Sequence, residues 1–395
     1  IDNYGLAIVY PIFSPLFLNP HLELLGTHFT FFHRTLLLGL LIASFPLAQF
    51  FGAPFIGAFS DRVGRRKMFI VTISGGIIGY IMTGLGIHFQ EIHLLWIGRV
   101  LAGFFAGNLT LCLAAIADIT AKKGERTRNF GWVGTLGGLG FVLAIFAGGS
   151  LSNPNLNAFF HPEIPFFLTG FLSAVNLCLI IHFYKESHTV KPHDKIAFFK
   201  ALKNIKTAIT TKQVRAIYFA YFFFIVCWFT SMQFLSAYLL TDYSVSLNVI
   251  TFAFIMIAIT WSLANFLINP LLSRIVSPSK TFFMGMLFLS IFLYLTLIPH
   301  QPLFLFLIHF FVITLCAALS WTNGLATISI NVSKWIQGSI LGVNQSIVAI
   351  ASIVGPIIGG ILAGIDIHKL YLFTATCSLV GALLYFIHLL RIKKV

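Results

Sequence analysis

Charge is scarce in this sequence. Only 9% of its 395 residues are charged, whereas soluble globular domains usually carry about 25%. Acidic residues are the rarer sign, with 11 Asp and Glu against 25 Lys and Arg. Hydrophobic residues make up 58% of the chain, and its mean hydropathy is +0.93. This composition excludes a soluble globular domain and predicts an integral membrane protein.

Several chemical motifs are also missing. The chain has no Gly-Lys-Ser/Thr triplet, so the sequence gives no support for ATP-driven transport. Its five cysteines all lie in apolar runs without metal-ligand spacing, so we expect neither a disulfide framework nor a metal site. No nucleophile elbow or metalloprotease helix is present. We therefore expect no enzymatic activity and no cofactor.

Long apolar runs dominate the chain, and they are continuous rather than alternating, which predicts membrane-spanning helices and argues against a β-barrel. The fold class expected is an all-α polytopic membrane protein with twelve transmembrane helices. The first run begins at residue 1, so we expect the first span to lack its leading residues. The predicted spans are 1–18, 35–60, 68–88, 92–117, 128–151, 164–184, 212–240, 247–270, 280–299, 302–328, 337–364 and 368–390.

The cations are concentrated on one side of these spans. Twenty-two of the 25 Lys and Arg fall in the alternate loops 61–67, 118–128, 185–215, 271–280 and 329–336 and in the tail 391–395. The positive-inside rule places these loops and both termini in the cytoplasm. The excess of 14 positive charges therefore reflects topology and a lipid bilayer with anionic headgroups, and no nucleic-acid partner is expected.

The longest polar stretch divides the spans into six and six. The predicted domains are 1–184, a cytoplasmic linker 185–211 and 212–395. The segment "DKIAFFKALKNIKTAI" within the linker predicts an amphipathic helix on the membrane surface; a solvated charge run is the alternative. "GWVGTLGGLGFVLAIFAGGSL" resembles "GVNQSIVAIASIVGPIIGGIL" 211 residues later. Two pseudo-symmetric six-helix halves around a central site are typical of a transporter.

Three segments resemble a known family. The loop "GAFSDRVGRRK" resembles the signature loop of the major facilitator superfamily between its second and third helices. "GRVLAGFFAGNLTLCLAAIADIT" and "DNYGLAIVYP" resemble the fourth and first helices of its drug:proton antiporters. The N-terminal half is most similar to the tetracycline:proton antiporters. The resemblance implies the major facilitator fold over the whole chain.

The resemblance also implies a role for the charged loop. In this family the loop forms a cytoplasmic latch that is closed in one state and open in the other. Here a glycine would permit a tight turn, an aspartate would approach a helix N-terminus, and arginines would pair with an aspartate below the fourth helix. A simple topology anchor is the alternative. The latch residues are Asp61, Arg62, Gly64, Arg65, Arg66 and Asp118.

Two charged residues stand clearly within predicted spans rather than at their basic ends, Asp2 in the first and Arg99 in the fourth. A charge there costs roughly 3 kcal/mol or more on insertion scales, so it is a candidate for function. We expect Asp2 to be the protonatable group, with Arg99 as its partner or as a substrate anchor. A hydrated, structural Asp2 at the cytoplasmic interface is the alternative.

The chain departs from the tetracycline antiporters in its second half. Their acidic residue in the ninth helix and histidine in the eighth are missing here, and the fifth helix lacks Gly-Pro before its Gly-Gly. These differences leave the substrate and the direction of transport open. Glycine motifs in the fifth and eleventh helices predict close helix packing. Their residues are Gly148, Gly149, Gly355, Pro356, Gly359 and Gly360.

In this superfamily, helices 1, 4, 7 and 10 line the central cavity, flanked by 2, 5, 8 and 11. The polar and aromatic residues on them predict an amphipathic pocket for an organic solute, although each one alone is as readily an interhelical hydrogen bond. The cavity candidates are Tyr4, Asn108, Trp228, Gln233, Trp261, Asn265, His309, Trp321, Asn323, Asn344 and Gln345. Eight further histidines, His88 and His368 among them, fall on the predicted periplasmic side. They lack metal-ligand spacing, so we expect interfacial side chains; a pH-responsive rim is the alternative.

Together these observations predict a proton-coupled secondary transporter that exports a small amphipathic drug or metabolite by alternating access. Proton-coupled uptake of a small organic anion or metabolite is the first alternative, and a non-transporting membrane receptor or scaffold is the second. The expected partners are a small-molecule substrate, protons and the lipid bilayer. We expect a monomer in a bacterial inner membrane.

Overall fold

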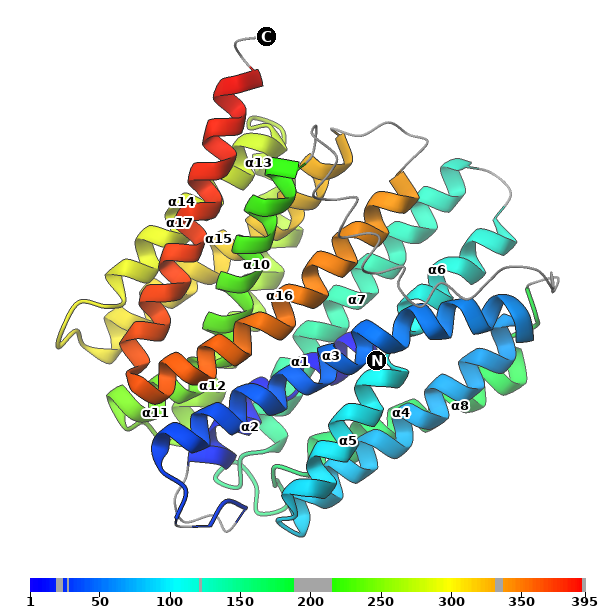
Figure 1. The fold of residues 1–395 in the computed structure, drawn as a ribbon, viewed down its shortest axis with the longest axis horizontal. Helices are drawn as coiled ribbons and strands as arrows, with labels where there is room; N and C mark the ends of the chain where they lie inside the picture. The colour runs from blue at the N-terminus through cyan, green and yellow to red at the C-terminus, as the bar shows by residue number, and fades with distance from the viewer. Residues whose placement is uncertain (19–23, 27, 121–122, 188–214, 331–336, 393–395) are drawn as a thin grey trace. The chain divides into compact units, whose positions relative to one another are not determined.

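The structure is a computed structural model, and it describes residues 1–18, 24–26, 28–120, 123–187, 215–330 and 337–392 (Figure 1). Within these ranges all regular secondary structure is helical. The predicted surface helix of the linker lies outside the described residues. The all-α fold class predicted from the sequence is confirmed.

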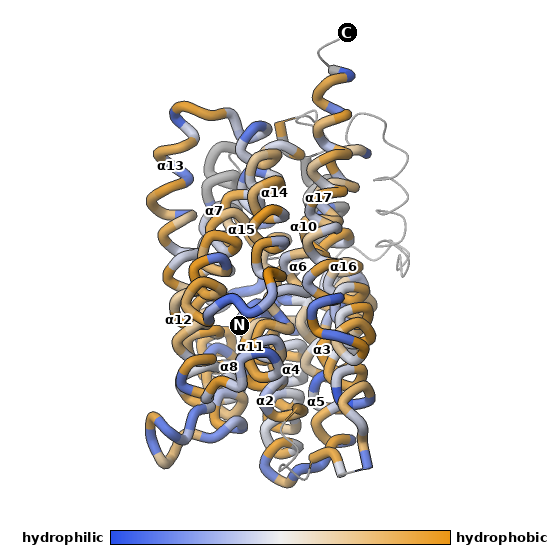
Figure 2. The backbone as a smooth tube through the Cα atoms, turned by 90° about the vertical axis from the view of Figure 1, so that its left-hand side faces the viewer, coloured by the Kyte–Doolittle hydropathy of each residue, from blue (hydrophilic) through white to orange (hydrophobic). Residues whose placement is uncertain are grey.

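Ten described segments are long and apolar enough to cross a membrane. Hydrophobic residues occupy most of the length of these helices, as Figure 2 shows. Two further segments, Asp2–Leu18 and Lys123–Leu151, correspond to the first and fifth predicted spans. Large side chains on the outer faces of several helices remain exposed, among them Phe171, Phe266 and Phe304. Such exposed apolar faces are what a bilayer would cover.

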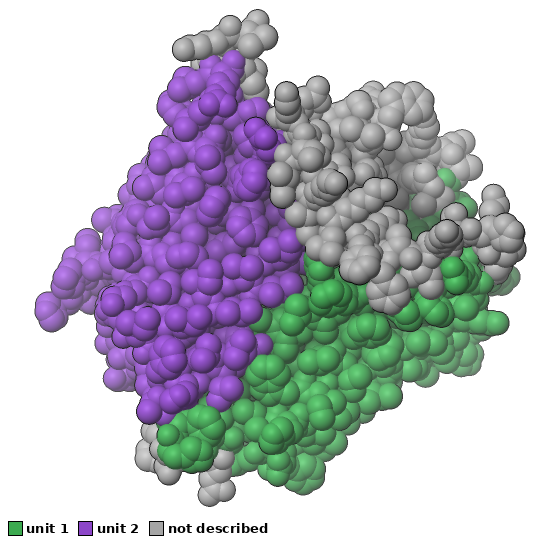
Figure 3. Space-filling view, viewed as in Figure 1, with its two compact units in different colours: residues 1–29, 41–200 green, residues 30–40, 201–395 purple. Residues whose placement is uncertain are grey.

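The described helices fall into two compact units (Figure 3). Unit 1 comprises residues 1–29 and 41–200, and unit 2 comprises residues 30–40 and 201–395. The helices of unit 1 are α1 (Asp2–Ala7), α2 (Tyr10–Leu18), most of α3 (Phe31–Val63), α4 (Arg65–His88), α5 (Ile92–Phe105), α6 (Asn108–Ile119), α7 (Lys123–Leu151) and α8 (Ile164–Phe183). The domain boundaries predicted from the sequence stay a prediction.

Unit 2 begins with the first residues of α3 and continues through the C-terminal helices. They are α10 (Arg215–Gln233), α11 (Leu235–Tyr243), α12 (Leu247–Leu263), the π-helical turn η1 (Ala264–Ile268), α13 (Asn269–Leu272), α14 (Pro278–Leu295), α15 (Leu303–Ile330), α16 (Gln337–Ile365) and α17 (Ile367–Ile392). Within this unit α10 packs against α16 and α17, and α14 packs against α15 and α17.

Glycines allow the closest helix approaches in both units. A Cβ added to Gly148 of α7 would stand 2.6 Å from the carbonyl oxygen of Ile8. In unit 2 a Cβ on Gly360 of α16 would stand 3.2 Å from the Cα of Gly39 in α3. Gly355 and Gly359 face α10, where Thr230 and other side chains occupy the space of a Cβ. Four of the predicted packing glycines thus lie where helices touch.

Four predicted spans are not continuous α-helices. The spans predicted at 1–18 and 212–240 are each divided in two, the first into α1 and α2 and the second into α10 and α11. The span predicted at 92–117 is divided at Ala106 and Gly107 into α5 and α6, and the span predicted at 247–270 contains η1. Backbone groups released by such irregularities need partners, because hydrocarbon supplies none. The side chains that bind at the break between α5 and α6 form the core of the candidate site.

Candidate functional site

The break between α5 and α6 is bound by side chains from two neighbouring helices. The carbonyl oxygen of Ala106 accepts a hydrogen bond of 2.6 Å from Nε2 of Gln49 on α3. The backbone N–H of Asn108, the first residue of α6, donates to Oδ2 of Asp2 at 2.9 Å. Both backbone groups at the break, the carbonyl of Ala106 and the N–H of Asn108, therefore have side-chain partners. Gln49 was not among the predicted site residues.

Asp2 lies on α1 with its half-buried carboxylate at the N-terminus of α6. Its second oxygen, Oδ1, accepts a 2.9 Å hydrogen bond from Nδ2 of Asn108. The Oδ1 of Asn108 in turn accepts one of 2.6 Å from the hydroxyl of Thr72 on α4. A carboxylate at a helix N-terminus is stabilised by the free N–H groups there. The geometry thus links α1, α4 and α6 through one amide side chain.

Arg99 is fully buried on α5. Its Nη1 donates to the carbonyl oxygen of Gly5 on α1 at 3.1 Å. Its guanidinium carbon lies 4.5 Å from the centre of the Phe45 ring and 5.7 Å from that of Phe13. These rings offer cation–π stabilisation to a charge that has left water. The Nε and Nη2 groups have no hydrogen-bond partner among the described residues.

Asp2 and Arg99 both contact the same pair of spans, but they form no ion pair with each other. Asp2 binds Asn108, and Arg99 binds the backbone of α1 three residues after Asp2. The sequence suggested Arg99 as partner of Asp2 or as substrate anchor. The structure places the two groups in separate contacts, and it leaves part of the guanidinium unsatisfied in the interior.

The loop between α3 and α4 gathers its charges around one buried arginine. Arg65 Nη1 lies 2.6 Å from Oδ1 of Asp61, and its Nε lies 3.1 Å from Oδ2 of Asp118. The same guanidinium donates to Ser60. Gly64 turns the chain with φ of 97° and ψ of 152°, which only glycine adopts readily. Of the other predicted latch residues, Arg62 is exposed and Arg66 is the second residue of α4.

Glu186, just after α8, is a member of this cluster that sequence reasoning missed. Its carboxylate accepts the backbone N–H of Arg65 at 2.9 Å and that of Arg66 at 3.0 Å. The guanidinium of Arg66 donates to the carbonyl oxygen of Ile181 at 2.6 Å. Glu186 therefore caps α4 and ties it to the end of α8. The only signal in the sequence was an acidic residue just beyond a predicted span.

In unit 2 the predicted cavity residues form an aromatic group rather than a charged one. The rings of Trp228 and Trp261 stack with centroids 5.2 Å apart and planes 21° apart. Trp321 meets Trp261 at 6.3 Å, edge to face. Trp228 is fully buried, whereas Trp261 and Trp321 are half-buried. The three rings come from α10, α12 and α15, so they join three helices that are distant in sequence.

Amides accompany these rings. Asn265 accepts a 2.5 Å hydrogen bond from the hydroxyl of Thr322. Asn323 donates to Oδ1 of Asn269 at 2.7 Å. Both pairs connect α15 with the region of η1, whose residues hydrogen-bond with the wider spacing of a π-helix. No residue pattern in this span predicted the irregular turn.

The remaining cavity candidates do not all join a common group. Gln233 is buried, and its amide nitrogen and oxygen have no partner among the described residues. His309 packs against the ring of Phe292, and Tyr4 is buried on α1. Asn344 is buried on α16, while the side chain of Gln345 lies outside the described parts.

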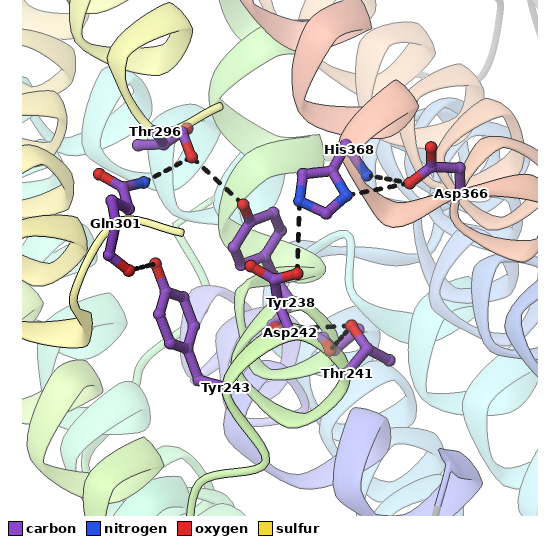
Figure 4. A network of polar contacts seen from close by, with 9 residues as sticks. Tyr238, Thr241, Asp242, Tyr243, Thr296, Gln301, Asp366 and His368 are labelled. Carbon is purple, nitrogen blue, oxygen red and sulfur yellow. Dashed lines mark hydrogen bonds and ion pairs between the residues drawn. The ribbon is translucent and has the colours of Figure 1, made fainter. Parts of the chain in front are cut away.

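A polar cluster also stands at the end of α11 and the start of α17 (Figure 4). The ring of His368 lies between two carboxylates, with Nε2 3.3 Å from Asp242 and Nδ1 3.1 Å from Asp366. Asp366 also accepts the backbone N–H of His368 at 2.9 Å. This N–H, with the ring, lowers the pKa of Asp366 below its ordinary value. Only an imidazolium, with both nitrogens protonated, can donate to both carboxylates.

Comparison with known proteins places the chain in a family. The sequence profile described as Major Facilitator Superfamily matches residues 4–259 and 217–394. The chain belongs to the major facilitator superfamily. Multidrug resistance protein 2 of Bacillus subtilis (strain 168) is 26% identical over 377 residues, which cover 87% of this chain and 84% of the relative.

Other superfamily members match part of the sequence or the fold. Tetracycline resistance protein class C of Escherichia coli is 31% identical over 189 residues, 48% of this chain and 43% of its own length. The human organic anion transporter MFSD10 (TETRAN) superposes with a TM-score of 0.67 over 97% of this chain and 96% of its own, at 18% identity. A D-xylose-proton symporter superposes with a TM-score of 0.73 over 97% and 93%, at 14% identity. The chain is thus a multi-pass membrane transporter and not an enzyme.

Proposed function

We propose that this transporter exports small amphipathic organic compounds in exchange for protons. It acts by alternating access, as a monomer in a bacterial inner membrane with both termini in the cytoplasm. The similarity to Multidrug resistance protein 2 over most of both chains supports the drug-export part of the proposal. The similarity to tetracycline resistance proteins, which covers about half of each chain, supports it further.

One observation of the site favours proton coupling above all. Asp2, the acidic residue of the first span, has its carboxylate in an amide network within unit 1, near a fully buried arginine. An ionisable residue within a membrane span costs free energy, so its presence there makes it a candidate for function. We assign Asp2 as the group that takes and releases the proton, and Arg99 as the fixed positive charge beside the path.

The aromatic group of unit 2 supports the substrate part of the proposal. Trp261 and Trp321 present half-buried rings, with amide and hydroxyl groups beside them at Asn265 and Thr322. Aromatic faces bind flat apolar groups, while the adjacent polar atoms orient them. We propose that these residues contact the organic part of the substrate.

Proteoliposomes with a pH-sensitive dye in the lumen test the exchange. The lumen is loaded with a candidate drug such as tetracycline or an amphipathic cation, and the vesicles are diluted into drug-free buffer. Efflux of drug through an antiporter drives protons inward, so the lumen should become more acidic. Asp2→Asn should reduce this signal by about tenfold or more. Asp366→Asn, which removes an aspartate from the exposed cluster at α17, is the matched control and should keep it.

The sign of the signal separates the possible outcomes. Acidification that requires both drug and Asp2 supports the proposal. Alkalinisation would show symport and would contradict export by proton exchange. Drug movement with no change in lumenal pH in either protein would contradict proton coupling.

A further inference from the structure

The two sides of the break in the fourth span are bound by different kinds of side chain. On the acceptor side, the carbonyl oxygen of Ala106 is bound by the amide of Gln49, a group that does not change charge. On the donor side, the N–H of Asn108 is bound by the carboxylate of Asp2, a group that does. A freed backbone group inside a bilayer must find a partner. The donor side of the break is therefore sensitive to protonation.

Protonation would change the hydrogen bonds of Asp2 in a definite way. The ionised carboxylate accepts from Asn108 with both oxygens, Oδ2 from the backbone N–H and Oδ1 from the side-chain Nδ2, each at 2.9 Å. A protonated carboxyl group carries a hydroxyl, so one of its oxygens would place a donor against a donor. One of the two bonds is then lost. The favourable interaction of the negative charge with the N-terminus of α6 is lost as well.

Asn108 transmits this change to a third helix. Its side chain donates to Asp2 through Nδ2 and accepts from Thr72 of α4 through Oδ1. An amide that releases Asp2 is free to turn, and its bond to Thr72 must then change too. The Thr72 hydroxyl has an alternative partner in its own helix, the carbonyl oxygen of Met68 at 2.9 Å. The network therefore has a second arrangement, in which the Thr72 hydroxyl donates to Met68 and still has a partner.

We propose that Asn108 is a positioning residue that couples the protonation of Asp2 to the junction of α5 and α6. With Asp2 ionised, Asn108 holds α1, α4 and the start of α6 together. With Asp2 protonated, this link opens and the two halves of the fourth span can change their relative angle. Asn108 was predicted only as a polar residue of the substrate cavity. The inference rests on the proposed function, because it assigns a mechanical consequence to the same proton.

Other titratable groups surround the carboxylate and contribute to its titration. The phenol of Tyr80 on α4 and the thiol of Cys112 on α6 interact with Asp2 electrostatically. Arg99 on α5 acts on Tyr80. A test must therefore compare variants that leave all of these groups in place. Substitutions at Asn108 and Thr72 do so.

Infrared difference spectroscopy of the purified transporter can follow the proton directly. The C=O stretch of a protonated carboxyl group appears as Asp2 binds its proton, and Asp2→Asn identifies that band by its loss. In Asn108→Leu, which has a similar size and no donor, the midpoint should move to higher pH by about one unit, because a hydrogen bond to the ionised form is lost. Asn108→Ser should restore part of the shift.

A matched control lies in unit 2. Asn265→Leu removes an interhelical amide bond, that to Thr322, without touching a carboxylate, and it should leave the midpoint unchanged. If Asn108→Leu does not assemble, Thr72→Val tests the same link. It removes the partner of the Asn108 oxygen, and it should give a smaller shift in the same direction.

The outcomes separate this inference from the proposed function. An unchanged midpoint in Asn108→Leu, or in Thr72→Val where that variant stands in, overturns the role of Asn108 even if wild-type vesicles exchange drug for protons. A shifted midpoint supports the role of Asn108 even if no drug-dependent proton flux is found, in which case the proposed exchange fails alone. A shift of equal size in Asn265→Leu would indicate a general loss of packing and would overturn the inference.

Discussion

The candidate site of unit 1 and the tryptophan group of unit 2 contain different kinds of polar group. Unit 1 contains Asp2 and a fully buried Arg99, each bound to backbone or amide groups of another helix. The polar contacts beside the three tryptophans of unit 2 are made by neutral amides and hydroxyls, such as those of Asn265, Thr322 and Asn323. An ionisable group can bind and release protons, whereas aromatic rings and amides can bind organic molecules. Under the proposed function, the charged groups of unit 1 serve proton coupling and the tryptophan group of unit 2 serves substrate recognition.

The largest effect expected from this division is at Arg99. Arg99→Gln removes the charge and its bond to Gly5, and hydrogen bonds to charged groups contribute about 1.5–3 kcal/mol, or roughly ten- to hundredfold. Drug-dependent proton flux in vesicles should fall by about that factor. Asn323→Leu in unit 2 removes a neutral interhelical bond of about 0.6 kcal/mol and should reduce flux only about threefold. Equal losses in the two variants would refute the division.

The next effect concerns the stability of unit 1 at its charged loop. Gly64→Ala places a side chain on a backbone with φ of 97° and against the Glu186 carboxylate. The strained conformation alone should destabilise the protein by about 1–3 kcal/mol. Thermal unfolding in detergent measures this loss. Gly138→Ala in α7, where a Cβ would have no neighbour within 4 Å, is the control and should be neutral or slightly stabilising.

Recognition in unit 2 should be sensitive to Trp261. Trp261→Leu removes its stacking on Trp228 and its contact with Trp321, and aromatic pairs contribute about 0.5–1.5 kcal/mol beyond their area. We expect the apparent affinity for an aromatic drug, measured by tryptophan fluorescence quenching or by transport, to fall about two- to tenfold. The midpoint of the Asp2 titration should not move. A shifted midpoint would show that the units are not specialised in this way.

The smallest effect expected is at the exposed cluster of α17. The pKa of Asp366 is lowered by the N–H and the ring of His368, so its ionised form stabilises the folded protein. This contribution is present above the ordinary pKa of an aspartate and is lost as pH falls through the lowered value. Both side chains are nearly half exposed, so solvent screens the pair. Asp366→Asn should lower the Tm slightly at about pH 6 and by less at about pH 3. An equal decrease at both pH values would contradict an electrostatic origin.

The class of protein could be predicted from the sequence because composition determines that class. Long apolar runs, and 22 cations in alternate loops and the C-terminal tail, admit few other architectures. The loop "SDRVGRRK" likewise suggested contacts for its arginines, and the structure brings Arg65 to 3.1 Å from Asp118. Charged residues are so rare in this chain that each has few possible partners.

The contacts of neutral polar residues could not be predicted in the same way. Asn108 is 106 residues from Asp2 and 36 from Thr72, and no periodicity links them. The break at Ala106 and Gly107 gives no clear signal, because glycine is common within transmembrane helices. Gln49 and Glu186 bind backbone groups, and a backbone partner leaves no trace in the sequence. Side chains that bind backbone groups were therefore among those missed.

The π-helical turn in the eighth span affects how this chain can change by insertion and deletion. Its wider turn closes with the N–H of Asn269 bonded to the carbonyl oxygen of Ala264, so it accommodates one residue more than an α-helix would. A deletion of one residue within 264–268 would restore ordinary α-helical spacing while the span stays apolar. The turn absorbs the extra residue, so after such a deletion the residues that follow would keep their orientation and Asn269 would stay beside Asn323. A deletion elsewhere in the span would instead turn every later residue by about 100°. The π-helical turn is thus the place where this span can lose a residue and keep the site beside the tryptophans.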